Sequence, residues 1–329
     1  MSANYKIANY KSANYKIANL FMLFLLTYNI MLAVIISYLY FGIFRNTAVG
    51  AFFTSPWFLL INQFVGLLLP MFIFRSITEK LNEASQLVSD TNQLNGATDK
   101  TIPKKPLGFV NVLLVIVLSL LLQPFMMLIS AIMTVFMPNP VAGMIYGFTE
   151  APFLLTLAII AITPSICEEW VFRGYIQSMY ESQPVFFIVL INGLFFGIIH
   201  MNLHQFAYAF AMGIVFSYMV YLTKSVFSAV IAHMVVNGTQ FSLGYFAIRH
   251  MPAGVELYEG EGWASVLALG QLALLILPVV VGLFYVFVRH NVRHNVRHDK
   301  CDKGENEHPF DFVFWAVIVV FVGFILVFR

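Results

Sequence analysis

The stretch LFMLFLLTYNIMLAVIISYLYFGIF, residues 20–44, decides the class of fold. It runs for about 25 residues without a charged side chain, and about 20 apolar residues are enough for a helix to cross a bilayer. A signal peptide is not expected, because its apolar region would be shorter and a small-residue cleavage site would follow it. The stretch therefore predicts a membrane-spanning helix that stays in the mature protein.

Further apolar runs follow along the chain. They cover residues 51–74, 107–137, 141–162, 185–200, 205–222, 226–247, 263–288 and 310–328. Hydrophobic residues make up 60 % of the chain and charged residues only 10 %, whereas a soluble domain carries about 25 % charged residues. The sequence predicts an all-α polytopic integral membrane bundle of about 8–9 transmembrane helices.

Between the apolar runs, polar segments suggest a division of the chain into four regions. These are a cytoplasmic polar tail with a tandem repeat (1–19), two transmembrane helices with a polar loop (20–106), a core (107–247), and two C-terminal helices with a basic, histidine-rich loop (248–329). With the N-terminus in the cytoplasm, all 18 Lys and Arg residues except Arg45, Arg249 and Arg329 fall inside. This distribution follows the positive-inside rule.

Net charge and cysteine content exclude several classes of protein. A formal net charge of +2 is too small to indicate a nucleic-acid partner, and the apolar composition makes the lipid bilayer the expected surroundings. Cys167 and Cys301 are too few for a disulfide framework. Cys167 has apolar neighbours and is expected to be a buried structural thiol. The histidine-rich tract around Cys301 is expected to be a solvated basic loop and not a metal site.

Charged residues gather in one otherwise apolar segment, Cys167–Arg173. Charges at membrane depth cost several kcal/mol, so each needs a partner or a function. Successive helical residues project about 100° apart, so Glu168 and Glu169 face different directions, while Glu169 and Arg173 share a face. This spacing predicts a Glu169–Arg173 pair and leaves Glu168 free to face a cavity. The alternative is that all three side chains are solvated at the cytoplasmic interface.

Two more apolar segments carry side chains that can bind or transfer protons. His200 ends one run, and His233 with Asn237 occupies one face of another at a spacing of four residues. A single histidine near a helix end is more often a satisfied core group than a catalyst. A carboxylate, two imidazoles and a carboxamide on three segments nevertheless form a candidate site.

These residues form three motifs in a fixed order. They are Glu168-Glu169-x-x-x-Arg173, Phe196-x-x-x-His200 and His233-x-x-x-Asn237. In this order, on successive hydrophobic segments within residues 107–247, they resemble the motifs of the CPBP family. That family is also known as CAAX proteases and bacteriocin-processing enzymes, or Abi, and includes the Ras-converting prenyl-protein endopeptidase.

The resemblance implies hydrolysis of a peptide bond in the membrane by a glutamate-activated water, without a cofactor. It implies Glu168 as the base and His200 as the group that orients the water. It implies His233 and Asn237 as donors to the oxyanion, with Glu169 and Arg173 as a supporting pair. The substrates it implies are a CAAX-like prenyl protein, a bacteriocin or pheromone precursor, or a membrane regulator. A bacterial plasma membrane is the expected location.

Two other functions stay open at this point. Glu168, His200 and His233 could bind zinc, with Glu169 as the base of a metalloprotease. The sequence lacks HExxH, and Asn237 is a poor zinc ligand, so the metal-free site is preferred. The second alternative function is that of a non-catalytic protein. Such a protein would be either a scaffold in bacteriocin self-immunity or a transporter that uses its buried charges.

Overall fold

A computed structural model of the chain describes residues 3–88, 106–250, 262–295 and 309–328. Within these ranges the secondary structure is helical and contains no strand, which confirms the predicted all-α class. Seven of the described helices are long and apolar enough to cross a membrane. Two shorter apolar helices, Val185–Ile198 and Phe312–Val327, accompany them. The protein is therefore a polytopic integral membrane protein, as predicted.

The chain divides into two compact units. Unit 1 contains residues 1–103, 170–188 and 300–329, and unit 2 contains residues 104–169 and 189–299. Of the predicted site residues, Arg173 belongs to unit 1 and the others belong to unit 2. The division at residues 1–19, 20–106, 107–247 and 248–329 stays a prediction. The histidine-rich tract around Cys301 lies outside the described residues.

Unit 1 is built around helix α1. Its elements are α1 (Ala3–Tyr38), η1 (Leu39–Phe44), α2 (Ala48–Phe53), α3 (Pro56–Gln63), η2 (Phe64–Leu68), α4 (Leu69–Val88), η4 (Trp170–Ile176), α10 (Gln177–Met179) and α15 (Phe312–Val327). Helix α1 contacts α4, α10 and α15. Asn19 fixes α15 to α1, because its amide donates to Asp311 Oδ1 over 2.9 Å and Asp311 caps the first turn of α15.

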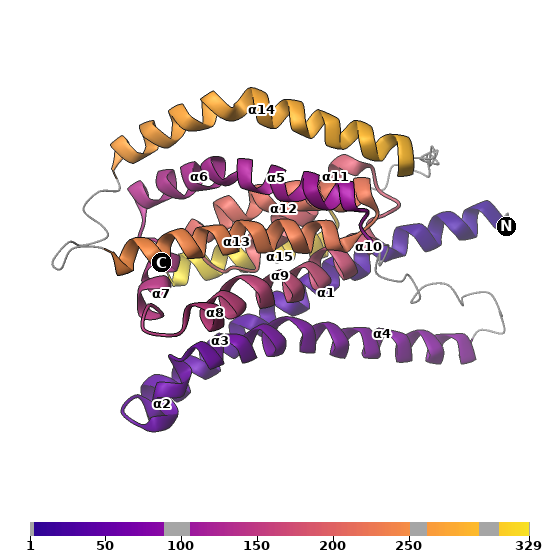
Figure 1. The fold of residues 1–329 in the computed structure, drawn as a ribbon. Helices are drawn as coiled ribbons and strands as arrows, with labels where there is room; N and C mark the ends of the chain where they lie inside the picture. Colours follow the sequence, from indigo (N-terminus) through magenta and orange to yellow (C-terminus); the bar gives the residue numbers. More distant parts are fainter. Residues whose placement is uncertain (1–2, 89–105, 251–261, 296–308, 329) are drawn as a thin grey trace. The chain divides into compact units, whose positions relative to one another are not determined.

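Unit 2 contains the elements on which most of the predicted site lies. They are α5 (Phe109–Leu121), α6 (Gln123–Phe136), α7 (Pro140–Gly147), α8 (Phe153–Leu157), η3 (Ala158–Ile162), α9 (Thr163–Glu169), α11 (Val185–Ile198, in this unit from Val189), α12 (Leu203–Thr223), α13 (Val226–Arg249) and α14 (Trp263–Asn295). Helix α13 contacts α5, α7, α8, η3, α9 and α12, and α14 lies along α5 and α6 (Figure 1). The residues of α13 therefore face several neighbours at once.

The predicted span 141–162 is wrong. Helix α7 ends at Gly147, and a new membrane-length helical segment runs from Phe153 to Met179. Pro152 precedes α8 in an extended conformation and separates the two apolar stretches, since proline disfavours helical backbone in the residue before it. The charged motif therefore lies inside a span, with Glu168 and Glu169 at the end of α9 and Arg173 in the π-helical segment η4.

Two glycines bring α11 and α12 close together. A Cβ atom built on Gly213 would lie 2.7 Å from the Cα of Gly193, and one built on Gly193 would lie 2.7 Å from Ile214 Cγ1. Small residues that let backbones approach closely are typical of helix contacts in membranes. This close contact sets the spacing between the helix that ends near His200 and the next helix.

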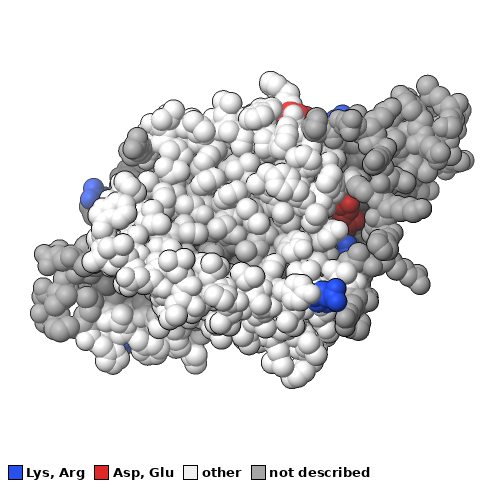
Figure 2. All heavy atoms as spheres, turned by 90° about the horizontal axis from the view of Figure 1, so that it is seen from above, with Lys and Arg blue, Asp and Glu red and all other residues white. Residues whose placement is uncertain are grey.

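The exposed surface is apolar, as a lipid environment requires. Figure 2 shows one face on which most described atoms belong to uncharged residues, and the few Lys, Arg, Asp and Glu side chains are scattered. Large apolar side chains are exposed on the spans, for example Leu275 at 76 % and Val319 at 69 %. In water such exposure would favour aggregation, whereas acyl chains solvate it.

Candidate active site

Helix α13 carries His233 and Asn237 one turn apart. The helix begins at Val226, directly after a tight connection in which Lys224 ends α12 in the left-handed conformation, with φ 55°. The spacing of four residues puts both side chains on one face, as the sequence predicted. His233 is 2 % exposed, whereas Asn237 is only partly buried. One group on this face is therefore enclosed and the other remains accessible.

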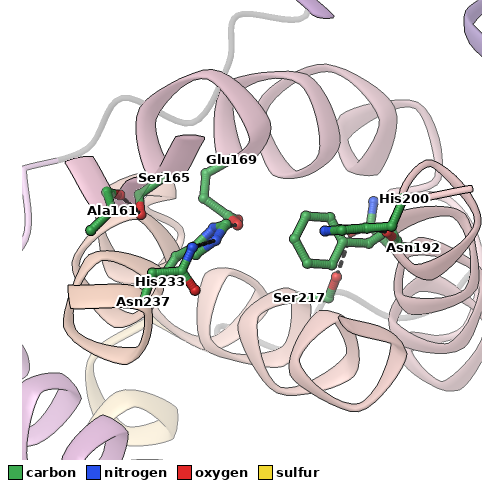
Figure 3. A network of polar contacts seen from close by, with 9 residues as sticks. Ala161, Ser165, Glu169, Asn192, His200, Ser217, His233 and Asn237 are labelled. Carbon is green, nitrogen blue, oxygen red and sulfur yellow. Dashed lines mark hydrogen bonds and ion pairs between the residues drawn. The ribbon is translucent and has the colours of Figure 1, made fainter. Parts of the chain in front are cut away.

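A chain of hydrogen bonds links Glu169, His233 and Asn237 (Figure 3). Glu169 Oε1 lies 2.8 Å from His233 Nδ1, and His233 Nε2 lies 3.0 Å from Asn237 Nδ2. An ionised carboxylate only accepts, so Nδ1–H donates to Glu169 and Nε2 accepts from the Asn237 amide. Both ring nitrogens of His233 are thus engaged. A carboxamide nitrogen carries two hydrogens, and this bond uses one of them.

The sequence did not predict that Glu169 would bond to His233. The predicted Glu169–Arg173 pair assumed an α-helix through both residues, but a π-helix begins at Trp170 and changes the spacing of side chains along the turn. Arg173, which belongs to unit 1, is completely buried. Its pairing with Glu169 stays a prediction.

Glu168 differs from its neighbour in both exposure and hydrogen bonding. Glu169 is fully buried, while Glu168 is partly exposed. The Oε2 atom of Glu168 is nevertheless buried and has no hydrogen-bond partner among the described residues. A buried carboxylate oxygen without a partner is costly, and water or substrate can satisfy it. The structure therefore gives the two adjacent carboxylates different surroundings, as their angular separation on a helix predicted.

His200 lies just beyond the end of α11. Its Nδ1 is 2.8 Å from the backbone carbonyl of Phe196, which can only accept, so Nδ1 carries the proton in the neutral ring. The other nitrogen, Nε2, then has the lone pair. In Figure 3 His200 stands apart from the Glu169–His233–Asn237 chain. Imidazole Nε2 in this tautomer can accept a hydrogen bond from water.

Phe196 lies against both histidines. Its ring meets the His200 ring edge-on at 5.2 Å between centroids and the His233 ring edge-on at 5.7 Å. Phe216 covers another part of His233 at 5.5 Å. Aromatic contacts of this kind fix ring orientation and exclude water from buried surfaces. The phenylalanine of the second motif therefore holds both imidazoles in place.

The zinc alternative has no geometric support among the described residues. No group of three or more His, Cys, Asp or Glu side chains in this part of the chain could hold a metal ion. In particular, Glu168, His200 and His233 do not form such a group. His233 Nε2 also accepts from an amide hydrogen, and a zinc ion at this nitrogen would have to displace that amide.

Two buried polar residues near the motifs were not predicted. Ser217 of α12 donates to Asn192 Oδ1 of α11 over 2.8 Å, and both side chains are completely buried. The available signal was an asparagine and a serine inside apolar runs, which by itself does not distinguish a packing contact from a functional one.

Cys167 is buried, as predicted.

Comparisons with known proteins agree with the motifs. Residues 150–239 match the family described as Type II CAAX prenyl endopeptidase Rce1-like. A Bacillus subtilis (strain 168) protein named "Putative membrane peptidase YdiL" is 33 % identical over 84 residues, which cover 25 % of this chain and 34 % of the relative. The chain thus matches about a third of the length of that relative. No solved structure gives a significant match.

The matched segment contains the candidate site. Glu168, Glu169, His200, His233 and Asn237 all fall within residues 150–239, in the order and at the spacing of the three motifs. The resemblance to the CPBP family that the motifs predicted is therefore confirmed for this segment, which is the Rce1-like region of the chain.

Proposed function

We propose that the protein is an intramembrane endopeptidase in which Glu168 activates the water that attacks a peptide bond. The observation that supports this most directly is the buried Glu168 Oε2, which has no hydrogen-bond partner among the described residues. Glu168 lies next to a carboxylate that is already bonded to His233. The first carboxylate is thus available to water, and the second is engaged in holding an imidazole.

The steps of the reaction follow from these positions. Glu168 takes a proton from water, the resulting hydroxide attacks the carbonyl carbon, and the carbonyl oxygen becomes an oxyanion. The second amide hydrogen of Asn237 donates to that oxyanion. The C–N bond then breaks, and Glu168 returns its proton to the leaving amine. His200, through Nε2, accepts a hydrogen bond from the attacking water and orients it.

His233 acts through Asn237 in this proposal. Both of its ring nitrogens are engaged, one by Glu169 and one by the Asn237 amide, so it is better placed to hold Asn237 than to donate to the oxyanion itself. This changes the role that the family resemblance implied for His233. Groups fixed before the reaction stabilise developing charge without having to reorganise.

We propose a prenylated CAAX-like peptide as the substrate class. The description of the matched family supports it, and so does a site on membrane-length helices, where a lipidated peptide is already concentrated. A bacteriocin or pheromone precursor and a membrane regulator are further candidates. The bacterial relative supports a bacterial plasma membrane, and the distribution of Lys and Arg supports a cytoplasmic N-terminus.

The test uses the full-length protein in liposomes with a fluorescence-quenched, farnesylated peptide that ends in a Cys-aliphatic-aliphatic-X sequence. Glu168→Gln keeps the shape of the side chain but removes the base, and a lost general base lowers kcat by about 10²–10⁴-fold. Glu150→Gln is the matched control, because Glu150 is exposed and lies outside the three motifs. A parallel reaction contains a chelator, followed by added zinc.

We expect cleavage by the wild type and by Glu150→Gln, with loss of cleavage in Glu168→Gln and no effect of the chelator. Cleavage that persists in Glu168→Gln would contradict the assignment of the base. Loss with the chelator and recovery with zinc would favour the metalloprotease. A wild type that binds the peptide without cleaving it would favour the non-catalytic scaffold.

A further inference from the structure

The span from Phe109 to Phe136 carries a buried polar residue, Gln123, near its middle. Helix α5 ends at Leu121 and α6 begins at Gln123, and Pro124, which has no backbone N–H, occupies the first turn of α6. Gln123 is 6 % exposed. Polar groups buried at membrane depth are expensive and need a partner or a function. None of the three motifs includes this residue.

The Gln123 side chain is bonded to the helix that carries His233 and Asn237. Its Nε2 atom donates to the backbone carbonyl oxygen of Val236 on α13 over 3.3 Å. A carbonyl oxygen only accepts, so the amide nitrogen of Gln123 is the atom that faces it. This carbonyl belongs to the peptide group that links Val236 to Asn237. Gln123 is thus bonded to the backbone from which the Asn237 side chain projects.

This bond is additional to the hydrogen bonds of α13 itself. Val236 lies inside the helix, so its carbonyl oxygen also accepts from the backbone N–H four residues further on, that of Gln240. Removal of the Gln123 amide would therefore leave no backbone group unpaired. It would remove only a fixed link between α13 and the start of α6.

Packing alone does not explain a glutamine at this position. The Val236 side chain belongs to an apolar cluster with Leu118 of α5 and Met126 of α6. The Oε1 atom of Gln123 is buried and has no hydrogen-bond partner among the described residues. A buried acceptor without a protein partner costs stability, whereas an apolar side chain of similar size does not. Residues that lower stability in this way are typical of positions where activity sets the residue type.

Two contacts from other helices thus meet the same segment of α13. Glu169 of α9 is bonded to His233, which accepts from the Asn237 amide. Gln123 of α6 is bonded to the backbone at Asn237. In the reaction, the second amide hydrogen of Asn237 has to meet an oxyanion whose position the substrate sets. A group misplaced by about 1 Å can cost about 10²-fold in rate, so both contacts matter for the position of this donor.

We propose that Gln123 is a positioning residue for the oxyanion donor: its amide holds the peptide group that links Val236 to Asn237 and thereby fixes where the Asn237 side chain meets the oxyanion. The inference rests on the proposed function, because it needs Asn237 to donate to that oxyanion. Gln123 acts through Asn237 and does not itself touch the substrate. Because the oxyanion exists only during the reaction, Gln123 affects kcat and leaves KM unchanged.

The experiment measures kcat, KM and the midpoint of thermal unfolding for Gln123→Met, with the same farnesylated peptide and liposomes. Methionine keeps the length of the side chain and removes the amide. We expect kcat to fall about 10-fold, with KM unchanged and a thermal midpoint no lower than that of the wild type. Intrinsic fluorescence in detergent follows the unfolding. A residue with a structural role alone would lower the thermal midpoint and leave the kcat of the folded protein unchanged.

Tyr245→Phe is the matched control. Tyr245 also lies on α13, about two turns beyond Asn237, and its hydroxyl donates to the Ala151 carbonyl over the same 3.3 Å. The variant removes one bond between α13 and another segment without acting on the peptide group at Asn237. We expect it to keep the wild-type kcat. An equal fall in kcat would mean that any loosened contact of α13 slows the reaction, and it would overturn the specific role of Gln123.

A double variant tests whether Gln123 acts through Asn237. If it does, Gln123→Met/Asn237→Ala loses no more kcat than Asn237→Ala alone. Multiplied losses would mean that the two residues act independently and would overturn the inference. If Gln123→Met fails to fold, Gln123→Leu takes its place. Failure of both variants would show that the glutamine is needed for folding, which also overturns the inference.

The outcomes separate this inference from the proposed function. If Glu168→Gln and Asn237→Ala lower kcat while Gln123→Met keeps the wild-type value, the inference is overturned and the proposed function stands. A raised KM with unchanged kcat in Gln123→Met would also overturn it, since Gln123 would then bind substrate. If Glu168→Gln retains activity, or the wild type cleaves nothing, the proposed function fails and the inference fails with it.

Discussion

Two hydrogen-bonded groups of polar side chains in unit 2 differ in what they leave available. Asn111 of α5 and Asn291 of α14 exchange amide hydrogen bonds in both directions, at 3.0 Å and 2.9 Å, and Asn291 also donates to the Phe287 carbonyl. The Glu169–His233–Asn237 chain uses one amide hydrogen of Asn237 and ends on a partly exposed side chain. A reciprocal pair satisfies itself, whereas an open-ended chain presents a donor for chemistry.

The comparison separates stability from catalysis. The asparagine pair joins two apolar helices and should contribute to the free energy of unfolding only. The open-ended chain should mainly stabilise the transition state of the reaction. Its last donor, the second amide hydrogen of Asn237, can bond to negative charge that appears only during the reaction. Substitutions at the two places should therefore change different measured quantities.

The largest effect is expected from Asn237→Ala. Loss of one oxyanion donor lowers kcat by about 10²–10³-fold. The midpoint of thermal unfolding should change little, because Asn237 is only partly buried. Cleavage of the farnesylated peptide and intrinsic fluorescence during heating measure the two quantities. A large fall in thermal stability with normal kcat would put Asn237 in the same class as the asparagine pair.

A smaller effect, on stability alone, is expected from Asn291→Leu. The substitution leaves the partly buried amide of Asn111 without its partner, which is expected to cost about 1 kcal/mol in the free energy of unfolding. The double variant Asn111→Leu/Asn291→Leu removes both amides and should recover much of the loss. Denaturant titration measures both values. If kcat of the folded double variant fell as in Asn237→Ala, the distinction between the two groups would be lost.

The smallest effect is expected from Ser217→Ala, which tests to which class a third buried pair belongs. Ser217 donates to Asn192 with both side chains fully buried, so its loss should cost about 1 kcal/mol of stability and leave kcat unchanged. Thermal unfolding and peptide cleavage distinguish the alternatives. A lowered kcat in this variant would assign the Asn192–Ser217 pair to the catalytic machinery.

Much of the site was predictable because its spacing is local. His233 and Asn237 are one helical turn apart, so any α-helix through them puts both on one face. The different directions of Glu168 and Glu169 followed from the same geometry. The pairing of Glu169 with His233 was not predictable, because it depends on a π-helical turn after Glu169 and on contact between α9 and α13.

The boundaries of the spans were predictable only in part. Hydropathy merges neighbouring apolar stretches, so residues 141–162 read as one helix although Pro152 divides them.

Sequence alone determined that the chain is an all-α membrane protein and which polar residues share a helix face, because helix length, hydropathy and the spacing of side chains along a turn are local properties. Only the tertiary structure decided which of the two carboxylates holds His233. Contacts between residues far apart in the chain depend on how helices pack, and packing is set by the whole bundle.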